Sequence, residues 1–104
     1  MESSGWVSVR CIFDAGDSAY EERITLWRAA SLEDGIRRAE TDAEEYASDV
    51  GMKYLRVAQA YLLADVPDDG AEVFSLIRSS GLRPEEYVDR YFDTGTEHQN
   101  RDDE

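Results

Sequence analysis

The alternation of apolar and polar side chains near the N-terminus constrains the fold more than any other feature of this sequence. The residues that would share one face of an extended segment are all apolar: Val7, Val9, Cys11 and Phe13. Successive side chains of a strand point to opposite faces of a sheet, so this period of two predicts a strand over 6–13 with one buried face. A turn-forming stretch, Asp14–Ser18, separates it from a second segment, Tyr20–Ala29, that is rich in β-branched and aromatic residues. Because the connection is short, we expect an antiparallel hairpin.

A long amphipathic helix is predicted after the hairpin. Ser31 is a typical N-cap residue, apolar residues recur every three or four positions up to Val50, and Gly51 is suited to end the helix. Gly35 lies in the second turn, where glycine costs about 1 kcal/mol of helix stability relative to alanine. A glycine retained at that cost predicts a close approach between the helix and the sheet.

The second half of the chain repeats the β-β-α pattern. Residues 54–65 predict a third strand that is apolar on both sides, although alanine, leucine and glutamine also favour a helix there. A turn at Pro67–Gly70 then leads to a fourth strand, Glu72–Arg78, and Pro84 begins a short helix that Gly95 would end. The expected fold is α+β in the order β-β-α-β-β-α. The long helix would lie across one face of a four-stranded, mostly antiparallel sheet.

The length of the chain predicts a single domain over residues 6–95, because 104 residues are enough for one modest core. Residues 1–5 would be an N-terminal extension, and residues 96–104, which lack large apolar side chains, an acidic disordered tail. We expect neither a signal peptide nor a membrane span, because residues 1–9 have no basic segment followed by an apolar one and no run approaches the about 20 consecutive apolar residues that span a bilayer. With one cysteine, Cys11, and no secretion signal, the expected location is the cytoplasm.

The net charge limits the partners of the chain. Asp and Glu number 24 and Lys and Arg number 11, so the formal net charge is −13. An acidic surface repels phosphate backbones and anionic lipid headgroups, which disfavours nucleic acid and membranes and favours a basic protein partner. The same acidity also serves simply to keep a small protein in solution.

The residue types that metal binding and catalysis require do not come together in the sequence. Cys11 has no histidine near it, because the single histidine, His98, lies in the predicted tail. The acidic turns at 14–17 and 65–69 lack the number and spacing of ligands of a calcium loop. Adjacent carboxylates, as at 44–45, diverge by about 100° on a helix and do not converge on one atom. We therefore expect no catalytic residue, no metal site, no cofactor and no enzymatic activity.

Four short runs of the sequence carry a family resemblance. They are Trp6-Val7-Ser8-Val9-Arg10, Tyr20-Glu21-Glu22-Arg23-Ile24, Ala71-Glu72-Val73-Phe74-Ser75 and Tyr91-Phe92. Their pattern and order, over roughly 6–95, resemble a small bacterial domain family of unknown function. The resemblance implies a compact intracellular α+β domain. It implies no activity, because none of these runs is a catalytic signature.

The sheet face opposite the long helix carries the residues best suited to binding. If Ile24 and Leu26 continue the apolar face of the first strand, the other face presents five candidate interface residues: Trp6, Arg10, Arg23, Trp27 and Tyr61. Tryptophan and arginine contribute most to the binding energy of protein interfaces, so a two-fold homodimer through this face is expected. In a competing interpretation, the C-terminal helix folds back and covers the face through its own aromatic residues, Tyr87, Tyr91 and Phe92.

Three functional hypotheses follow. The first is a non-enzymatic interaction module that self-associates through this aromatic and arginine face. The second is an inhibitor or immunity-type protein that docks on a basic partner, with an association that weakens as salt rises. The third is a small-ligand binder or enzyme with a pocket between helix and sheet.

Overall fold

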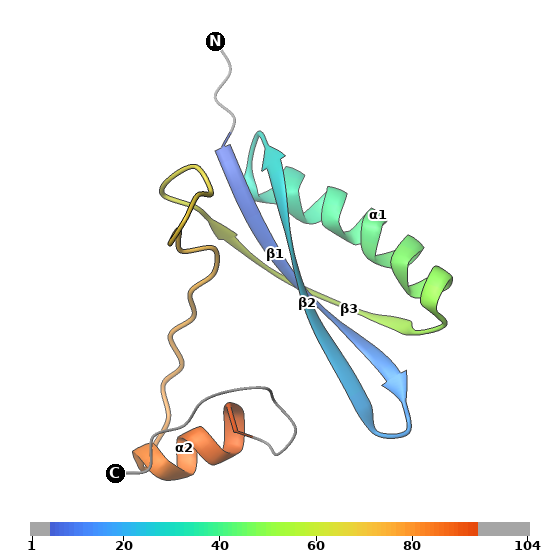
Figure 1. Cartoon of the computed structure of the whole chain (residues 1–104). Helices are drawn as coiled ribbons and strands as arrows, with labels where there is room; N and C mark the ends of the chain where they lie inside the picture. The colour runs from blue at the N-terminus through green and yellow to red at the C-terminus, as the bar shows by residue number, and fades with distance from the viewer. Residues whose placement is uncertain (1–4, 94–104) are drawn as a thin grey trace.

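One long helix packed on a three-stranded sheet forms the folded core of this α+β chain (Figure 1). The structure is a computed structural model, and it describes residues 5–93. The elements in chain order are β1 (Gly5–Gly16), β2 (Ala19–Ala29), α1 (Leu32–Val50), β3 (Lys53–Leu62) and α2 (Pro84–Tyr91). Both neighbours of β1 run antiparallel to it, so the strand order is β2-β1-β3 and β1 is the central strand.

The predicted four-stranded sheet is wrong. Within residues 5–93 the sheet has three strands, the order is β-β-α-β-α, and residues 72–78 form no ladder with β3. The turn before this segment gives a physical reason. Ala71 N donates to Asp68 O (2.9 Å) and Gly70 has a φ of 82°, which is the geometry of a type II turn. Tight hairpins use type I′ or II′ turns, whose twist matches that of the strands, so the chain does not return alongside β3.

The hairpin turns more tightly than predicted. Asp17 and Ser18 form its loop with φ values of 53° and 62°, as in a type I′ turn. Ala15 is an extra residue of β1 without a partner in β2, a β-bulge in which Gly16 N donates to Asp14 Oδ1 (2.9 Å).

This bulge reverses the predicted faces of β2. Val7 pairs with Trp27, and directly paired residues share a face of the sheet. Trp27 and Arg23 therefore lie on the side of α1. Ile24 and Leu26, which were expected to pack under the helix, lie on the opposite face and are 44% and 40% exposed. Without the bulge the register would shift by one residue, and the two faces would be exchanged as predicted.

The helix α1 begins and ends as its sequence predicts. Ser31 Oγ accepts a hydrogen bond from Asp34 N (3.0 Å), and Gly51 ends the helix in the left-handed conformation at φ 79°. The following segment is a strand and not the competing helix, and it begins at Lys53 and ends at Leu62.

Small residues let α1 approach the central strand closely. The buried core consists of Val7, Val9, Cys11, Phe13, Ala29, Ala39, Ala43, Ala47 and Tyr54. Gly35 continues the row of alanines by one more turn, and a Cβ added there would lie 2.7 Å from Val7 Cγ1. The predicted close approach at Gly35 is therefore confirmed, because no larger residue fits without displacing Val7.

Residues 64–93, called the arm from here on, leave the sheet after Leu63 and carry α2. Phe74 anchors the arm, because its ring centroid lies 6.1 Å from that of Tyr61 and 5.0 Å from the Arg10 guanidinium carbon. Beyond this anchor, α2 makes no contact with α1 or with any strand in the described part of the chain (Figure 1). No described helix is both long and apolar enough to cross a membrane. The predicted helix end at Gly95, the tail at 96–104 and residues 1–4 of the extension lie outside the described residues.

The substitution Gly35→Ala tests the close approach of α1. Although alanine is the better helix former by about 1 kcal/mol, we expect the free energy of unfolding to fall by about 1–3 kcal/mol, because the new methyl group overlaps Val7. Urea denaturation measures this change. The matched control is Gly81→Ala, whose added Cβ meets no atom within 4 Å and should change the stability by less than about 0.5 kcal/mol. A Gly35→Ala protein at least as stable as the wild type would contradict the packing described here.

Candidate interaction surface

The face of the sheet that α1 leaves uncovered is called the open face from here on. The strand ladders place Trp6, Arg10 and Tyr61 on it. Arg23 and Trp27, the other two predicted interface residues, lie on the helix side and do not join them. The structure thus divides the five residues between two faces, and their role in binding stays a prediction.

The arm covers one part of the open face, around Arg10. The Arg10 guanidinium donates through Nη2 to Gln59 Oε1 (2.6 Å), and its Nη1 lies 3.5 Å from Glu22 Oε1. With the Phe74 ring also over it, the Arg10 side chain is only 18% exposed. Ser8 beside it is fully buried, and its Oγ has no hydrogen-bond partner within the described residues. Arg10 therefore connects the sheet to the arm, and its side chain is too little exposed to bind a partner.

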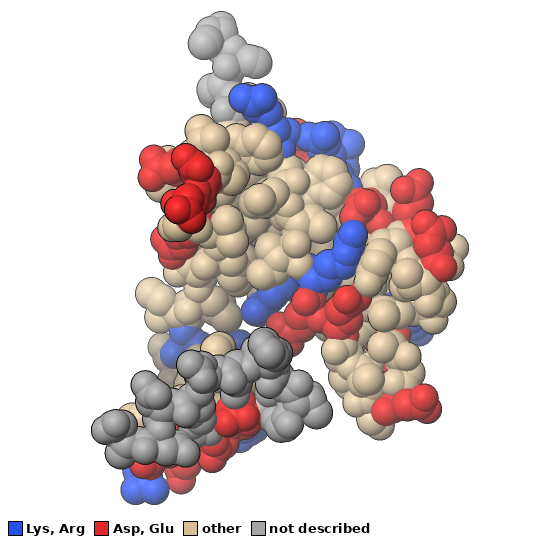
Figure 2. Space-filling view, in the orientation of Figure 1, with Lys and Arg blue, Asp and Glu red and all other residues tan. Residues whose placement is uncertain are grey.

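Four aliphatic side chains occupy the uncovered part of the open face, and they are called the apolar patch. They are Ile24 (44% exposed) and Leu26 (40%) on β2, and Leu55 (37%) and Val57 (46%) on β3. Between the two strands lies Ile12 of β1, which is half-buried. Figure 2 shows an area of uncharged side chains over part of the sheet on the side seen there, with Asp and Glu at one border and a band of Lys, Arg, Asp and Glu crossing the molecule at the other.

An irregularity in β3 directs two of these side chains outward. Between the pairs Cys11–Ala58 and Phe13–Tyr54, β1 has one residue and β3 has three, which are residues 55–57. Tyr54 and Ala58 pack into the core, so their neighbours Leu55 and Val57 point away from α1. Arg56 between them has a φ of 62° and forms an ion pair with Glu44 of α1.

On the helix side, Arg23 and Trp27 fasten β2 to α1. Arg23 Nη1 lies 3.0 Å from Asp42 Oδ2, and the Arg23 guanidinium carbon lies 3.9 Å from the centroid of the Tyr46 ring. Trp27 Nε1 donates to Thr25 Oγ1 (2.7 Å), and the Arg38 guanidinium carbon lies 5.3 Å from the centroid of the indole ring. These contacts are made within one chain and hold the edge of the sheet against the helix.

The buried polar groups of the core favour their protonated forms. Tyr54 Oη donates to Glu40 Oε2 (2.6 Å), and burial together with this hydrogen bond raises the pKa of the Tyr54 phenol. Burial also raises the pKa of the Cys11 thiol. A nucleophilic cysteine needs a lowered pKa, so the surroundings of Cys11 disfavour that chemistry. Within residues 5–93, no group of three His, Cys, Asp or Glu side chains is placed to hold a metal ion.

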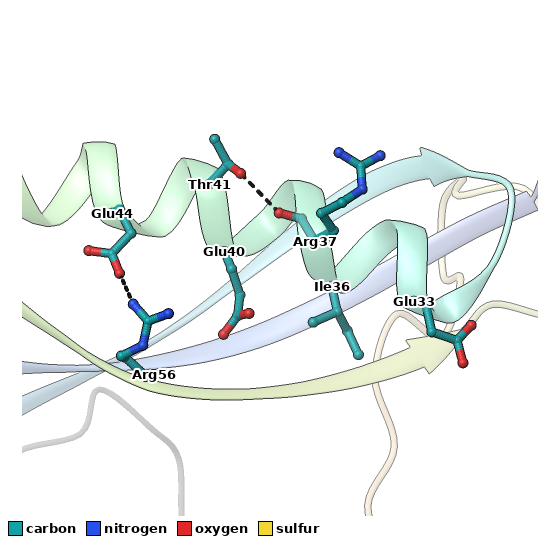
Figure 3. A pocket seen from close by; sticks show the side chains of 7 residues that line it. All are labelled: Glu33, Ile36, Arg37, Glu40, Thr41, Glu44 and Arg56. Carbon is teal, nitrogen blue, oxygen red and sulfur yellow. Dashed lines mark hydrogen bonds and ion pairs between the residues drawn. The ribbon is translucent and has the colours of Figure 1, made fainter.

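A shallow groove of about 470 Å³ runs between α1 and β3 (Figure 3). Its lining residues are Glu33, Ile36, Arg37, Glu40, Thr41, Glu44 and Arg56. Three of its charged side chains are in ion pairs, since Glu44 pairs with Arg56 and Arg37 pairs with Asp34, and Glu40 accepts a hydrogen bond from Tyr54. The groove is wide and open, so it offers a ligand little enclosure and little net charge.

Sequence reasoning missed the apolar patch and the role of Phe74. The alternation predicts Ile24 and Leu26 in the core, and it places Leu55 and Val57 in a strand that is apolar on both sides. The signal that could have identified the patch is the bulge at Ala15, but its neighbours Asp14 and Gly16 are equally typical of an ordinary loop.

Comparisons with known proteins leave the family open. No family model matches the sequence, and neither a curated protein nor a solved structure is significantly similar to the chain. The resemblance to a small bacterial domain family stays a prediction from four short runs.

The raised pKa of Tyr54 predicts a loss of stability at alkaline pH. The phenol of the unfolded chain ionises near pH 10, whereas the folded chain keeps this proton at higher pH. The stabilisation that results from the raised pKa of Tyr54 is fully present below about pH 10. Above it, the free energy of unfolding falls by about 1.4 kcal/mol per pH unit until the folded phenol also ionises. Tyr54→Phe removes this contribution, so its stability should fall less steeply between about pH 10 and 11.5.

Urea denaturation at each pH measures these slopes. Tyr20→Phe is the control, because Tyr20 is 64% exposed near the tip of the hairpin and its loss should leave the slope unchanged. Equal slopes for the wild type and Tyr54→Phe would contradict the assigned environment of Tyr54.

Proposed function

We propose that this chain is a non-enzymatic protein-interaction module that self-associates through the apolar patch. The observation that carries the proposal is the exposure of all four aliphatic side chains of the patch on the face of the sheet that α1 leaves open and the arm covers only in part. An antiparallel sheet that meets water on one face normally presents polar side chains there. Apolar patches rimmed by polar residues are typical of protein interaction sites.

The charges beside the patch resemble the rim of an interface. Glu22 and Arg28 lie on the same face of β2 as Ile24 and Leu26, one before and one after them. The Arg28 guanidinium carbon lies 5.5 Å from the centroid of the Trp6 indole ring. Trp6, one of the predicted interface residues, therefore lies at the border of the patch. An apolar centre with a charged and aromatic rim is the usual composition of such surfaces.

The net charge supports a second copy meeting at this patch in particular. Two chains of charge −13 repel each other, and the repulsion is weakest where neither presents carboxylates. Contact between uncharged patches allows association in spite of this repulsion, and added salt would strengthen it by screening. Docking of the carboxylates on a basic partner, the alternative function, would instead weaken as salt rises.

Replacing Leu26 by glutamate tests the proposal. We expect the wild type to approach twice 11.8 kDa at high concentration in light scattering coupled to size exclusion, and more completely at higher salt. Leu26→Glu should weaken the dimer by at least about tenfold, because it buries a charge at the contact. Since Leu26 is 40% exposed in the single chain, the free energy of unfolding should change by less than about 1 kcal/mol.

The matched control is Val50→Glu, at a position that is 49% exposed at the end of α1 and away from the patch. This variant should dimerise like the wild type. A wild type that stays at 11.8 kDa over the whole concentration range would refute the proposal, as would equal dimerisation of Leu26→Glu.

A further inference from the structure

We infer that the arm of one chain docks on the open face of a second copy, so that two chains exchange arms around a two-fold axis. The inference rests on the proposed self-association and names the segment that covers the apolar patch.

The arm carries its own set of exposed apolar side chains. They are Val66, Val73, Leu76, Ile77, Tyr91 and Phe92, and Ile77 is 93% exposed. Apart from the Phe74 contact, residues 5–93 therefore carry two exposed apolar surfaces, one on the sheet and one on the arm, that do not pack against each other. Burying either against the other removes both from water.

The helix α2 receives no support from α1 or from the sheet within residues 5–93. It has eight residues, whereas isolated helices shorter than about 12–15 residues are marginal in water. Its contacts come from the arm itself: Arg78 Nη1 donates to Tyr87 Oη (3.1 Å), and the Arg78 guanidinium carbon lies 4.2 Å from the centroid of the Tyr91 ring. An apolar surface outside the chain is the support that would stabilise so short a helix.

The path of the arm favours the second copy over the same chain. Phe74, about a third of the way along the arm, is fixed on Tyr61 and Arg10, and the chain then runs away from the sheet to α2 (Figure 1). Arg78 holds the rings of α2 at the far end of this path. If two chains are related by a two-fold axis, each arm reaches the sheet of the other chain. The same contact is then made twice, so that both apolar patches and both arms are covered.

Disulfide trapping between two different variants tests the exchange. Both variants carry Cys11→Ala, which removes the only native cysteine. One also carries Leu26→Cys on the open face, and the other Phe92→Cys at the end of α2. After mixing and mild oxidation, we expect a disulfide that joins one chain of each kind, identified by mass, at several times the yield of either homodisulfide. Ser48→Cys on the exposed side of α1 replaces Phe92→Cys in the matched control, and that pair should give little product.

The other outcomes separate this inference from the proposed function. A wild type that is monomeric at every concentration refutes both. The arm exchange alone is refuted if the wild type dimerises but two other results are found. These are that Leu26→Cys forms mainly its homodisulfide, and that Ile77→Glu and Phe92→Glu each weaken the dimer by less than twofold. A single chain that carries both Leu26→Cys and Phe92→Cys and closes an internal disulfide as a monomer also refutes it, because the arm then docks on its own sheet.

Discussion

The register of the β1–β2 hairpin is the constraint on which the rest of the structure depends. The bulge at Ala15 places one unpaired residue in β1, and every pair beyond it follows from that insertion. Trp27 and Arg23 consequently face α1, where they hold the edge of the sheet to the helix. Ile24 consequently faces outward, and the sheet acquires an apolar outer surface. One unpaired residue thus decides which side chains of β2 face the helix and which face away from it.

Local signals were enough to predict the elements themselves. The hairpin, the capped helix after Ser31, the third strand and the close approach at Gly35 all follow from spacing and from the chemistry of single residues. The faces of β2 could not be predicted, because alternation fixes which residues share a face but not which face is buried. The fourth strand failed for a related reason: alternation over 72–78 indicates an extended chain, and it cannot show whether a neighbouring strand pairs with it.

The candidate surface differs from its prediction in chemistry as well as in place. Tryptophan and arginine were expected to form it, but Arg10 and Arg23 are occupied by partners in their own chain. The uncovered residues are aliphatic, and they become visible only when the strands are paired. Charge was the most conspicuous property of the sequence, yet the side chains that lack it form the exposed centre of the open face.

The irregularity at Arg56 also bears on the size that an assembly of these chains can reach. A straight, unpaired strand at the border of a sheet is a template for the next chain, and repeated addition there yields open fibrils. In β3 the left-handed Arg56 and the two surplus residues around the Phe13–Tyr54 pair interrupt that template. Growth by strand addition is thereby hindered at one border, and contact through a face related by a two-fold axis closes on itself after two chains. The distortion therefore acts against edge-to-edge pairing of chains along β3.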